Sequence, residues 1–225
     1  LSAFNGIEQM IAKLYTSFDA PITIQHQSRK TFFLRQIDFQ QLKAINGVQA
    51  FSKELEELVV LRKNQRWINA NMHAVDAEFV KQAKVNTHLI NRVGVEYLNN
   101  PSFVFLGADV FSKLKLGLGS EQNNIQLYAP KRNMKMKLGK TPFHIQPIDV
   151  AGALNYNQEL NSNALLWDYN AASLLFDQGG AVTRIHVYAD PNVDLLEIQN
   201  NIKRLVGPDF LVRTQLEKNE LIYKT

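Results

Sequence analysis

Two segments with the same layout, one near each end of the 225-residue chain, constrain the fold more than any other feature. In the first, a strand predicted over 22–25 precedes a helix whose free amides Asp38 can cap. Gly47 offers the left-handed exit from that helix, and the next strand begins at Val48. The spacing of cap, helix and glycine predicts a strand–helix–strand unit.

The second segment repeats this layout with different residues. A strand predicted over 182–188 is followed by Asp194 at a capping position, by apolar residues of helical spacing and by Gly207. The next strand is expected at 210–212. Because the two units lie at opposite ends of the chain, we expect the ends to fold together and the residues between them to form an insertion.

The intervening residues predict a hairpin and then a mixture of strands and helices. Residues 55–61 and 67–75 predict the two strands of a hairpin around Lys63-Asn64-Gln65, and apolar and polar residues alternate in the second strand. Trp67 and His73 fall on the polar side of that alternation. Other predicted strands are 103–106, 125–128, 143–150 and 160–167, and other predicted helices are 2–18, 107–116 and 169–176. Residues 79–95 show no clear pattern, and Gly179-Gly180 is a candidate hinge. The chain is therefore predicted to be an α+β protein.

Composition excludes several classes of protein. Apolar residues make up 45% and charged residues 20%, which is typical of a globular chain. There is no cysteine, which removes disulfides, thiolate metal sites and thiol catalysis. A net charge of 25 − 21 = +4 is too small to indicate nucleic acid by itself. No apolar run approaches the roughly 18–20 residues that cross a bilayer.

Motifs for catalysis or metal binding are absent from the sequence. The histidines are His26, His73, His88, His144 and His186. No two have helical metal-ligand spacing, so they are expected to be ordinary surface or strand residues. Glu54, Glu56 and Glu57 are interpreted as a solvated cluster, and no G-x-S-x-G motif occurs. We expect no catalytic residue, no metal and no cofactor, and therefore no enzyme.

A run of basic residues is the one local charge anomaly. Its five cations are Lys131, Arg132, Lys135, Lys137 and Lys140, with no acid among them. The alternation over 134–138 predicts an exposed hairpin with one apolar face. The run is either a solvated arm or a contact site for an acidic protein or lipid head groups. Nucleic acid is less favoured because no aromatic residue is interleaved with the charges.

Four segments, in order along the chain, resemble one family. Residues 2–8, 73–79, 105–130 and 207–219 are similar to the extracytoplasmic domain of FtsX-like permeases of the lipoprotein-releasing ABC transporter, the LolC/LolE type. The central segment carries the family's glycine–helix–glycine–strand pattern with Gly107, Gly117 and Gly119. The resemblance covers nearly the whole chain.

The resemblance implies a MacB-like periplasmic core domain. Such a domain has a porter lobe built from both chain ends, here 1–79 and 179–225, and an inserted sabre lobe, here 80–178. It performs no chemistry and couples ATP hydrolysis in the cytoplasm to lipoprotein release. The implied partners are a second permease subunit (homo- or heterodimer), a cytoplasmic ATPase subunit and a lipoprotein or periplasmic carrier. The implied location is the periplasmic face of the bacterial inner membrane.

The resemblance also bears on the basic run and on the chain ends. In the LolC member a carrier-capturing hairpin follows a strand ending in proline, and the basic run occupies that location after Pro130. The sequence begins at Leu1 without a methionine and ends at Thr225, so we expect membrane helices on both sides. The alternatives are a MacB-like efflux or cell-wall-hydrolase-regulating permease domain and a free-standing periplasmic binding or adaptor protein.

Overall fold

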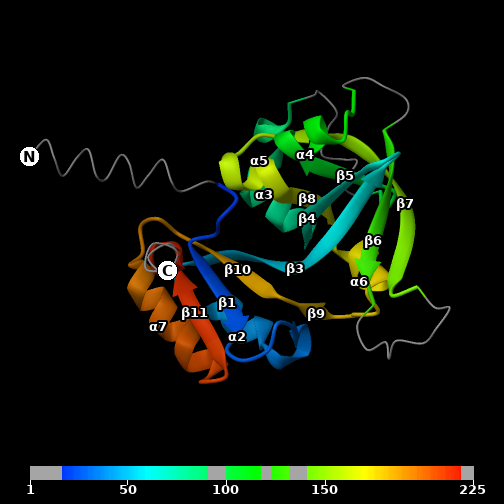
Figure 1. Ribbon diagram of the computed structural model, residues 1–225. Coiled ribbons are helices and arrows are strands. Elements are labelled where there is room, and N and C mark those ends of the chain that lie inside the picture. The colour runs from blue at the N-terminus through cyan, green and yellow to red at the C-terminus, as the bar shows by residue number, and fades with distance from the viewer. Residues whose placement is uncertain (1–16, 91–99, 118–122, 132–140, 219–225) are drawn as a thin grey trace, which may run out of the picture.

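The computed structural model describes residues 17–90, 100–117, 123–131 and 141–218. In this part of the chain nine strands form one sheet in the order β11-β1-β10-β3-β4-β8-β5-β7-β6, and β2 (Phe32–Phe33) pairs separately with β9 (Ala181–Val182) (Figure 1). Most of the predicted helix at 2–18 and the tip of the basic hairpin lie outside the described residues. None of the described helices is long and apolar enough to cross a bilayer.

The two strand–helix–strand units are confirmed, and they interleave. The first consists of β1 (Ile22–His26), α2 (Phe39–Ala44) and the start of β3 (Val48–Lys63), and the second consists of β10 (Arg184–Ala189), α7 (Leu195–Val206) and β11 (Phe210–Thr214). Their strands lie side by side, all antiparallel, in the order β11-β1-β10-β3. This is the split β-α-β arrangement, in which each unit supplies one central and one flanking strand.

The predicted caps form in both units. The Asp38 carboxylate accepts hydrogen bonds from the amides of Gln40 and Gln41, and the Asp194 carboxylate accepts one from Leu196. Gly47 has a φ of 87°, and a Cβ placed there would meet Ile198 Cδ1 at 2.7 Å. The helix ends at Ile45, whose backbone is extended, so the predicted left-handed helix exit at Gly47 is wrong. The glycine instead serves the turn in which the amide of Val48 donates to the carbonyl of Ile45, and it allows the close approach of α7.

The remaining strands close a ring with the far end of β3. The strands are β4 (Arg66–Val75), β5 (Phe103–Gly107), β6 (Asn124–Pro130), β7 (Phe143–Leu154) and β8 (Ala164–Asp168). Because the last part of β3 also pairs with β6, the order β3-β4-β8-β5-β7-β6 closes into a barrel. Leu61, Met72 and Leu127 belong to the apolar core enclosed by these strands and lie fully buried.

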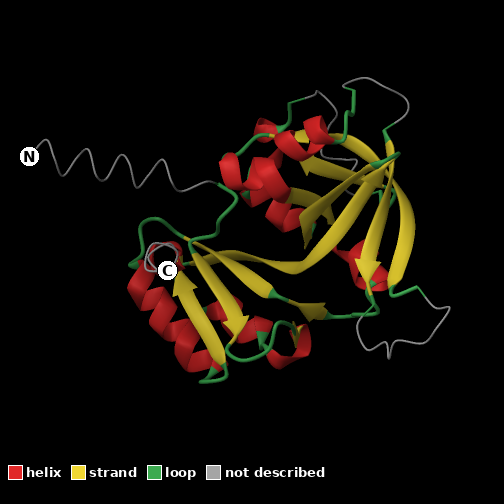
Figure 2. Ribbon diagram, viewed as in Figure 1, coloured by secondary structure: helices red, strands yellow, loops and turns green. Residues whose placement is uncertain are grey.

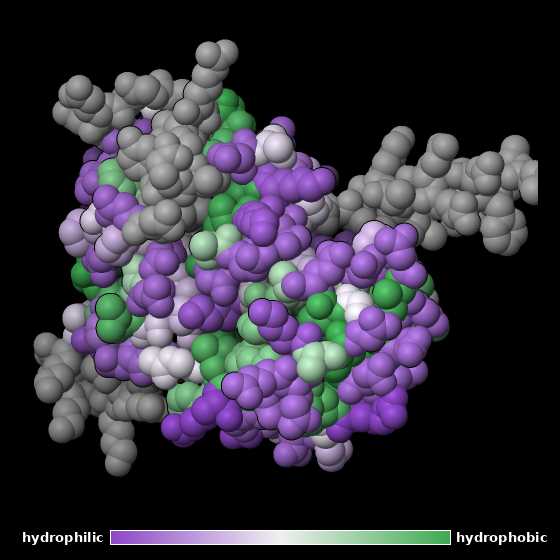
Figure 3. Space-filling model, turned by 180° about the vertical axis from the view of Figure 1, so that it is seen from behind, coloured by the Kyte–Doolittle hydropathy of each residue, from purple (hydrophilic) through white to green (hydrophobic). Residues whose placement is uncertain are grey.

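Short helices cover one outer side of the barrel and its ends (Figure 2). They are α3 (Ala77–Gln82), α4 (Ala108–Lys113), α5 (Gln158–Asn163) and α6 (Tyr169–Leu175), with the 3-10 turn η2 (Val85–His88). The other 3-10 turn, η1 (Leu34–Gln36), lies between β2 and α2 in the chain. A second core cluster lies outside the barrel wall, where Phe79 of α3 packs against Phe105 and Leu166. From behind, the described surface is largely hydrophilic, with hydrophobic residues in patches (Figure 3).

Several predicted elements differ from those observed. The predicted strand at 160–167 is wrong in its first half, which forms α5 because Asn157 caps the amide of Leu160. The strand predicted at 182–188 is interrupted at Thr183, which separates β9 (Ala181–Val182) from β10. Residues 77–88, mostly left unassigned, form α3 and η2. The division at 79 and 179 stays a prediction, since β3 pairs with β10 at one end and β6 at the other.

Candidate functional site: a buried polar cluster beside the two chain ends

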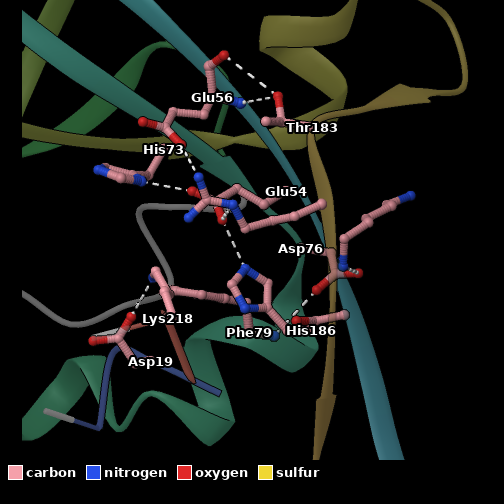
Figure 4. A network of polar contacts seen from close by, with 12 residues as sticks. Asp19, Glu54, Glu56, His73, Asp76, Phe79, Thr183, His186 and Lys218 are labelled. Carbon is pink, nitrogen blue, oxygen red and sulfur yellow. Dashed lines mark hydrogen bonds and ion pairs between the residues drawn. The ribbon is translucent and has the colours of Figure 1, made fainter. Parts of the chain in front are cut away.

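A carboxylate is buried in the middle of β3, where the two parts of the sheet meet. Glu54 is fully buried, and its two oxygens contact His73 Nδ1 at 2.6 Å and His186 Nε2 at 2.7 Å (Figure 4). These histidines come from β4 and β10, the strands on either side of β3. The register of the strands brings the two histidines to Glu54, because Glu56 lies opposite His73 and Ser52 lies opposite His186. Residues directly opposite in antiparallel strands, and residues two apart, share a face.

Arg184 completes the cluster from β10, directly opposite Glu54. Its Nε lies 3.4 Å from Glu54 Oε2, and its guanidinium also contacts the Glu56 carboxylate. Burial raises the pKa of Glu54, but the charge of Arg184 and the hydrogen bonds from His186 and His73 outweigh burial and hold that pKa well below its usual range. Glu54 is therefore a buried anion at neutral pH.

Aromatic rings separate part of this cluster from water. The Phe18 ring meets His73 edge-on with ring centroids 5.2 Å apart, and the Phe79 ring meets His186 at 5.0 Å. Phe18 and Phe79 also contact each other at 5.0 Å. Burial raises the pKa of nearby Asp76, whose carboxylate caps α3 and accepts a hydrogen bond from the Lys53 amide. These contacts keep the charged groups in a poorly hydrated environment.

The other side of the cluster opens into a small cavity of about 180 Å³. His73, His186 and Arg184 line it together with Glu159 from α5. Among its described lining residues there is no serine or threonine, and the chain has no cysteine. The cavity therefore brings acids, bases and amides together without a hydroxyl or thiol nucleophile.

The first and last described segments of the chain meet at the rim of this cavity. Lys218 Nζ and Asp19 Oδ1 are 2.7 Å apart, and both residues line the cavity. The amide of Gln215 donates to the carbonyl of Pro21 at 3.0 Å. The Lys218–Asp19 pair thus joins two segments that are 199 positions apart in sequence.

Three residues of the cluster offer the donor atoms that a metal ion would need. Ligand atoms of Glu54, Glu56 and His73 lie within 4.8 Å of one another, which is a carboxylate and imidazole set suited to zinc. However, Arg184 contacts both carboxylates, and His73 Nδ1 is bonded to Glu54. A cation would have to displace the guanidinium, so the cluster is arranged as an ion-pair network rather than as a metal centre.

The cluster corrects two sequence interpretations. Glu54 and Glu57 are buried rather than solvated; Glu57 pairs with Lys30 at 2.6 Å. His73 and His186 lie in strands, which is one of the two predicted alternatives, but both are buried and belong to the network. Periodicity gives no signal for Glu54, because residues 55–61 show no regular alternation and both Glu54 and its neighbour Leu55 are buried.

The predicted contact site lies elsewhere and is only partly described. Lys131 stands at the base of the β6–β7 hairpin, where its amide donates to the carbonyl of Pro142 at 2.8 Å. The other predicted contact residues, Arg132, Lys135, Lys137 and Lys140, lie outside the described residues. The pairing of β6 with β7 from Asn124–Asp149 to Pro130–Phe143 does show the two strands from which that hairpin would extend.

Comparison with known proteins gives a fold. No family model matches the sequence, and no curated protein matches it. Among solved structures, the periplasmic region of MacB from Actinobacillus actinomycetemcomitans is similar with a TM-score of 0.58 and 14% identity, covering 91% of this chain and 92% of that one. The extracellular domain of the noncanonic ABC-type transporter YknZ from Gram-positive bacteria has a TM-score of 0.59 and 12% identity, covering 86% and 99%.

The chain has the fold of these two domains. The predicted mixed α/β, MacB-like fold is confirmed at this level, whereas the detailed porter and sabre arrangement stays a prediction.

Proposed function

We propose that this chain is the non-catalytic extracytoplasmic domain of an ABC transporter permease that serves lipoprotein release. The observation that carries the proposal is the fold, which spans 92% and 99% of two transporter domains on the outer side of a membrane. The ordered sequence resemblance to LolC/LolE-type permeases supports lipoprotein release over other cargo. The parent protein would be embedded in the inner membrane with a partner permease and a cytoplasmic ATPase.

The polar cluster has a physical role in this proposal. Membrane helices that move during the ATP cycle would connect to the two segments joined by Asp19 and Lys218. Beneath that pair lies the cluster in which Glu54 links β3 to β4 and β10. A displacement of the chain ends would therefore reach both parts of the sheet through charged contacts instead of through a flexible linker.

The test is depletion of the parent protein in the cells that make it. We expect lipoproteins to remain in the inner membrane fraction, and a parent protein lacking residues 17–218 to fail to restore their release. If lipoproteins reach their normal location while the cells become sensitive to exported compounds, lipoprotein release is wrong and a MacB-like efflux domain replaces it. Altered cell separation without either effect would favour the hydrolase-regulating permease.

A free-standing binding protein is the second candidate, and the cavity is the feature that bears on it. Its volume of about 180 Å³ is below the roughly 300–1,000 Å³ of typical small-molecule sites. A reading frame with a signal peptide and without membrane helices would contradict the permease proposal and support this alternative.

A further inference from the structure

The small cavity beside the polar cluster contains polar side chains that stand outside the ion-pair network. The side-chain amides of Asn71 and Asn163 line it, and no hydrogen bond joins either amide to the part of the chain that the structure describes. Asn71 lies two positions before His73 on β4, and its register partner on β8 is Ala164, the residue after Asn163. The two free amides therefore come from neighbouring elements to the same cavity.

His73 adds a hydrogen-bond acceptor to the lining of the cavity. Its Nδ1 contacts Glu54 at 2.6 Å, and because the Glu54 anion can only accept, that nitrogen carries a proton. In the neutral ring the other nitrogen, Nε2, is then an acceptor. Figure 4 shows this end of the ring directed away from Glu54. The cavity wall thus combines one acceptor with two amides, each of which both donates and accepts.

Most charges in the cavity wall already neutralise one another. The guanidinium of Arg184 contacts two carboxylates of the network, and Lys218 pairs with Asp19 at 2.7 Å. Glu159 is left as an exposed carboxylate with which no described cation pairs. A charged ligand would have to compete with the existing pairs, whereas a neutral ligand can bind to the remaining groups without breaking any of them.

The size of the cavity limits the ligand to a small molecule. Its volume of about 180 Å³ equals that of about six water molecules in the liquid, at roughly 30 Å³ each. This is room for one sugar ring, and it is below the roughly 300–1,000 Å³ of sites for drug-sized molecules. Phe18 and Leu160 supply apolar parts of the wall, against which the C–H groups of such a ring can pack.

We propose that this cavity binds a neutral, hydroxyl-rich ligand of the size of one sugar ring. A hydroxyl group both donates and accepts, so neighbouring hydroxyls can pair with the oxygen and the nitrogen of the Asn71 and Asn163 amides. Nε2 of His73 and the carboxylate of Glu159 accept further hydroxyl hydrogens. The inference does not depend on the transporter assignment.

Ligand-observed saturation-transfer NMR on the 225-residue chain tests the proposal. Glucose, galactose and N-acetylglucosamine are titrated as neutral probes, and glucosamine and gluconate are titrated as charged analogues. We expect at least one neutral sugar to bind saturably with a Kd below about 10 mM. The disaccharide of N-acetylglucosamine separates two sources of the sugar. Binding of the single sugar alone assigns a free sugar, and binding of both assigns the end of a glycan chain.

Amide substitutions test where the sugar binds. Asn71→Ala and Asn163→Ala should each weaken binding by about tenfold, the effect of one or two lost hydrogen bonds. The matched control is Asn69→Ala, which removes an exposed amide from the same strand outside the cavity and should leave the affinity unchanged. Asn163 lies at the end of α5, so its variant keeps the test valid if Asn71→Ala disturbs the sheet.

Three results would overturn the proposal. The first is that no neutral sugar binds saturably up to about 10 mM. The second is that neither Asn71→Ala nor Asn163→Ala weakens binding. The third is that glucosamine or gluconate binds about tenfold more tightly than glucose, because charge would then select the ligand.

Discussion

At the scale of single residues, Glu54 keeps a charge in the protein interior because Arg184, His73 and His186 surround it. Such an arrangement does not stabilise a fold by itself, since desolvation of the charges offsets their attraction. Removing one partner, however, leaves the others buried without compensation. The network therefore makes the joint between β3, β4 and β10 specific.

We predict that Glu54→Gln lowers the free energy of unfolding at pH 7 by about 3 kcal/mol, because it leaves Arg184 underpaired. The pKa of Glu54 lies well below its unfolded value of about 4.3, so its contribution is complete above that value and is lost as the pH falls towards the folded pKa. The difference between wild type and variant should thus shrink below about pH 4. Urea unfolding followed by circular dichroism measures both quantities.

The matched control for this substitution is Glu159→Gln, which changes an exposed carboxylate that also lines the cavity. It should alter stability by less than about 0.5 kcal/mol at any pH. Equal losses for the two variants, or a loss for Glu54→Gln that stays constant down to pH 2, would contradict a stabilising role for the Glu54 charge.

At the scale of elements, the turn at Gly47 decides how closely the two strand–helix–strand units approach each other. Gly47 combines a φ of 87° with contact distances of 2.7 Å to Ile198 Cδ1 and 2.9 Å to Val193 for an added Cβ. Gly180 has a similar φ of 75° with nothing within 4 Å. Gly47→Ala should therefore cost about 2–4 kcal/mol, from strain and overpacking together. Gly180→Ala should cost about 1 kcal/mol, from strain alone. Thermal unfolding of the two variants compares these costs, and equal losses would show that packing against α7 contributes nothing.

The same scale shows how much the sequence could predict. The α2 and α7 helices follow from Asp38 and Asp194, because capping depends only on residues a few positions apart. The alternation within β4 places Trp67 and His73 together on the polar side of the strand. In the structure Trp67 at its start is exposed, whereas His73 near its end is buried beneath Phe18. Local periodicity does not reveal which end of a strand another segment covers.

At the scale of the whole molecule, the polar cluster joins residues that are far apart in the sequence, so the sequence does not reveal it. Glu54 and His186 are 132 residues apart, and their contact exists only after the two units interleave. A histidine and a glutamate in separate strands give no short-range signal of that pairing. The overall fold was more accessible, because two matching units at the chain ends limit the ways in which the strands can combine.

The last prediction concerns the connection between the chain ends. The Asp19–Lys218 pair is partly exposed, so reversing one charge should change the stability of the domain by less than about 1 kcal/mol. Asp19→Lys and Lys218→Asp should nevertheless each speed amide hydrogen exchange at residues 17–24 and 210–218, and the double exchange should restore protection. In the parent protein, each single variant should reduce transport with ATP hydrolysis retained, and the double variant should recover it. If both single variants transport normally although exchange at the ends has increased, the pair only holds the ends together and does not transmit movement, because a coupling element must affect transport when it is loosened.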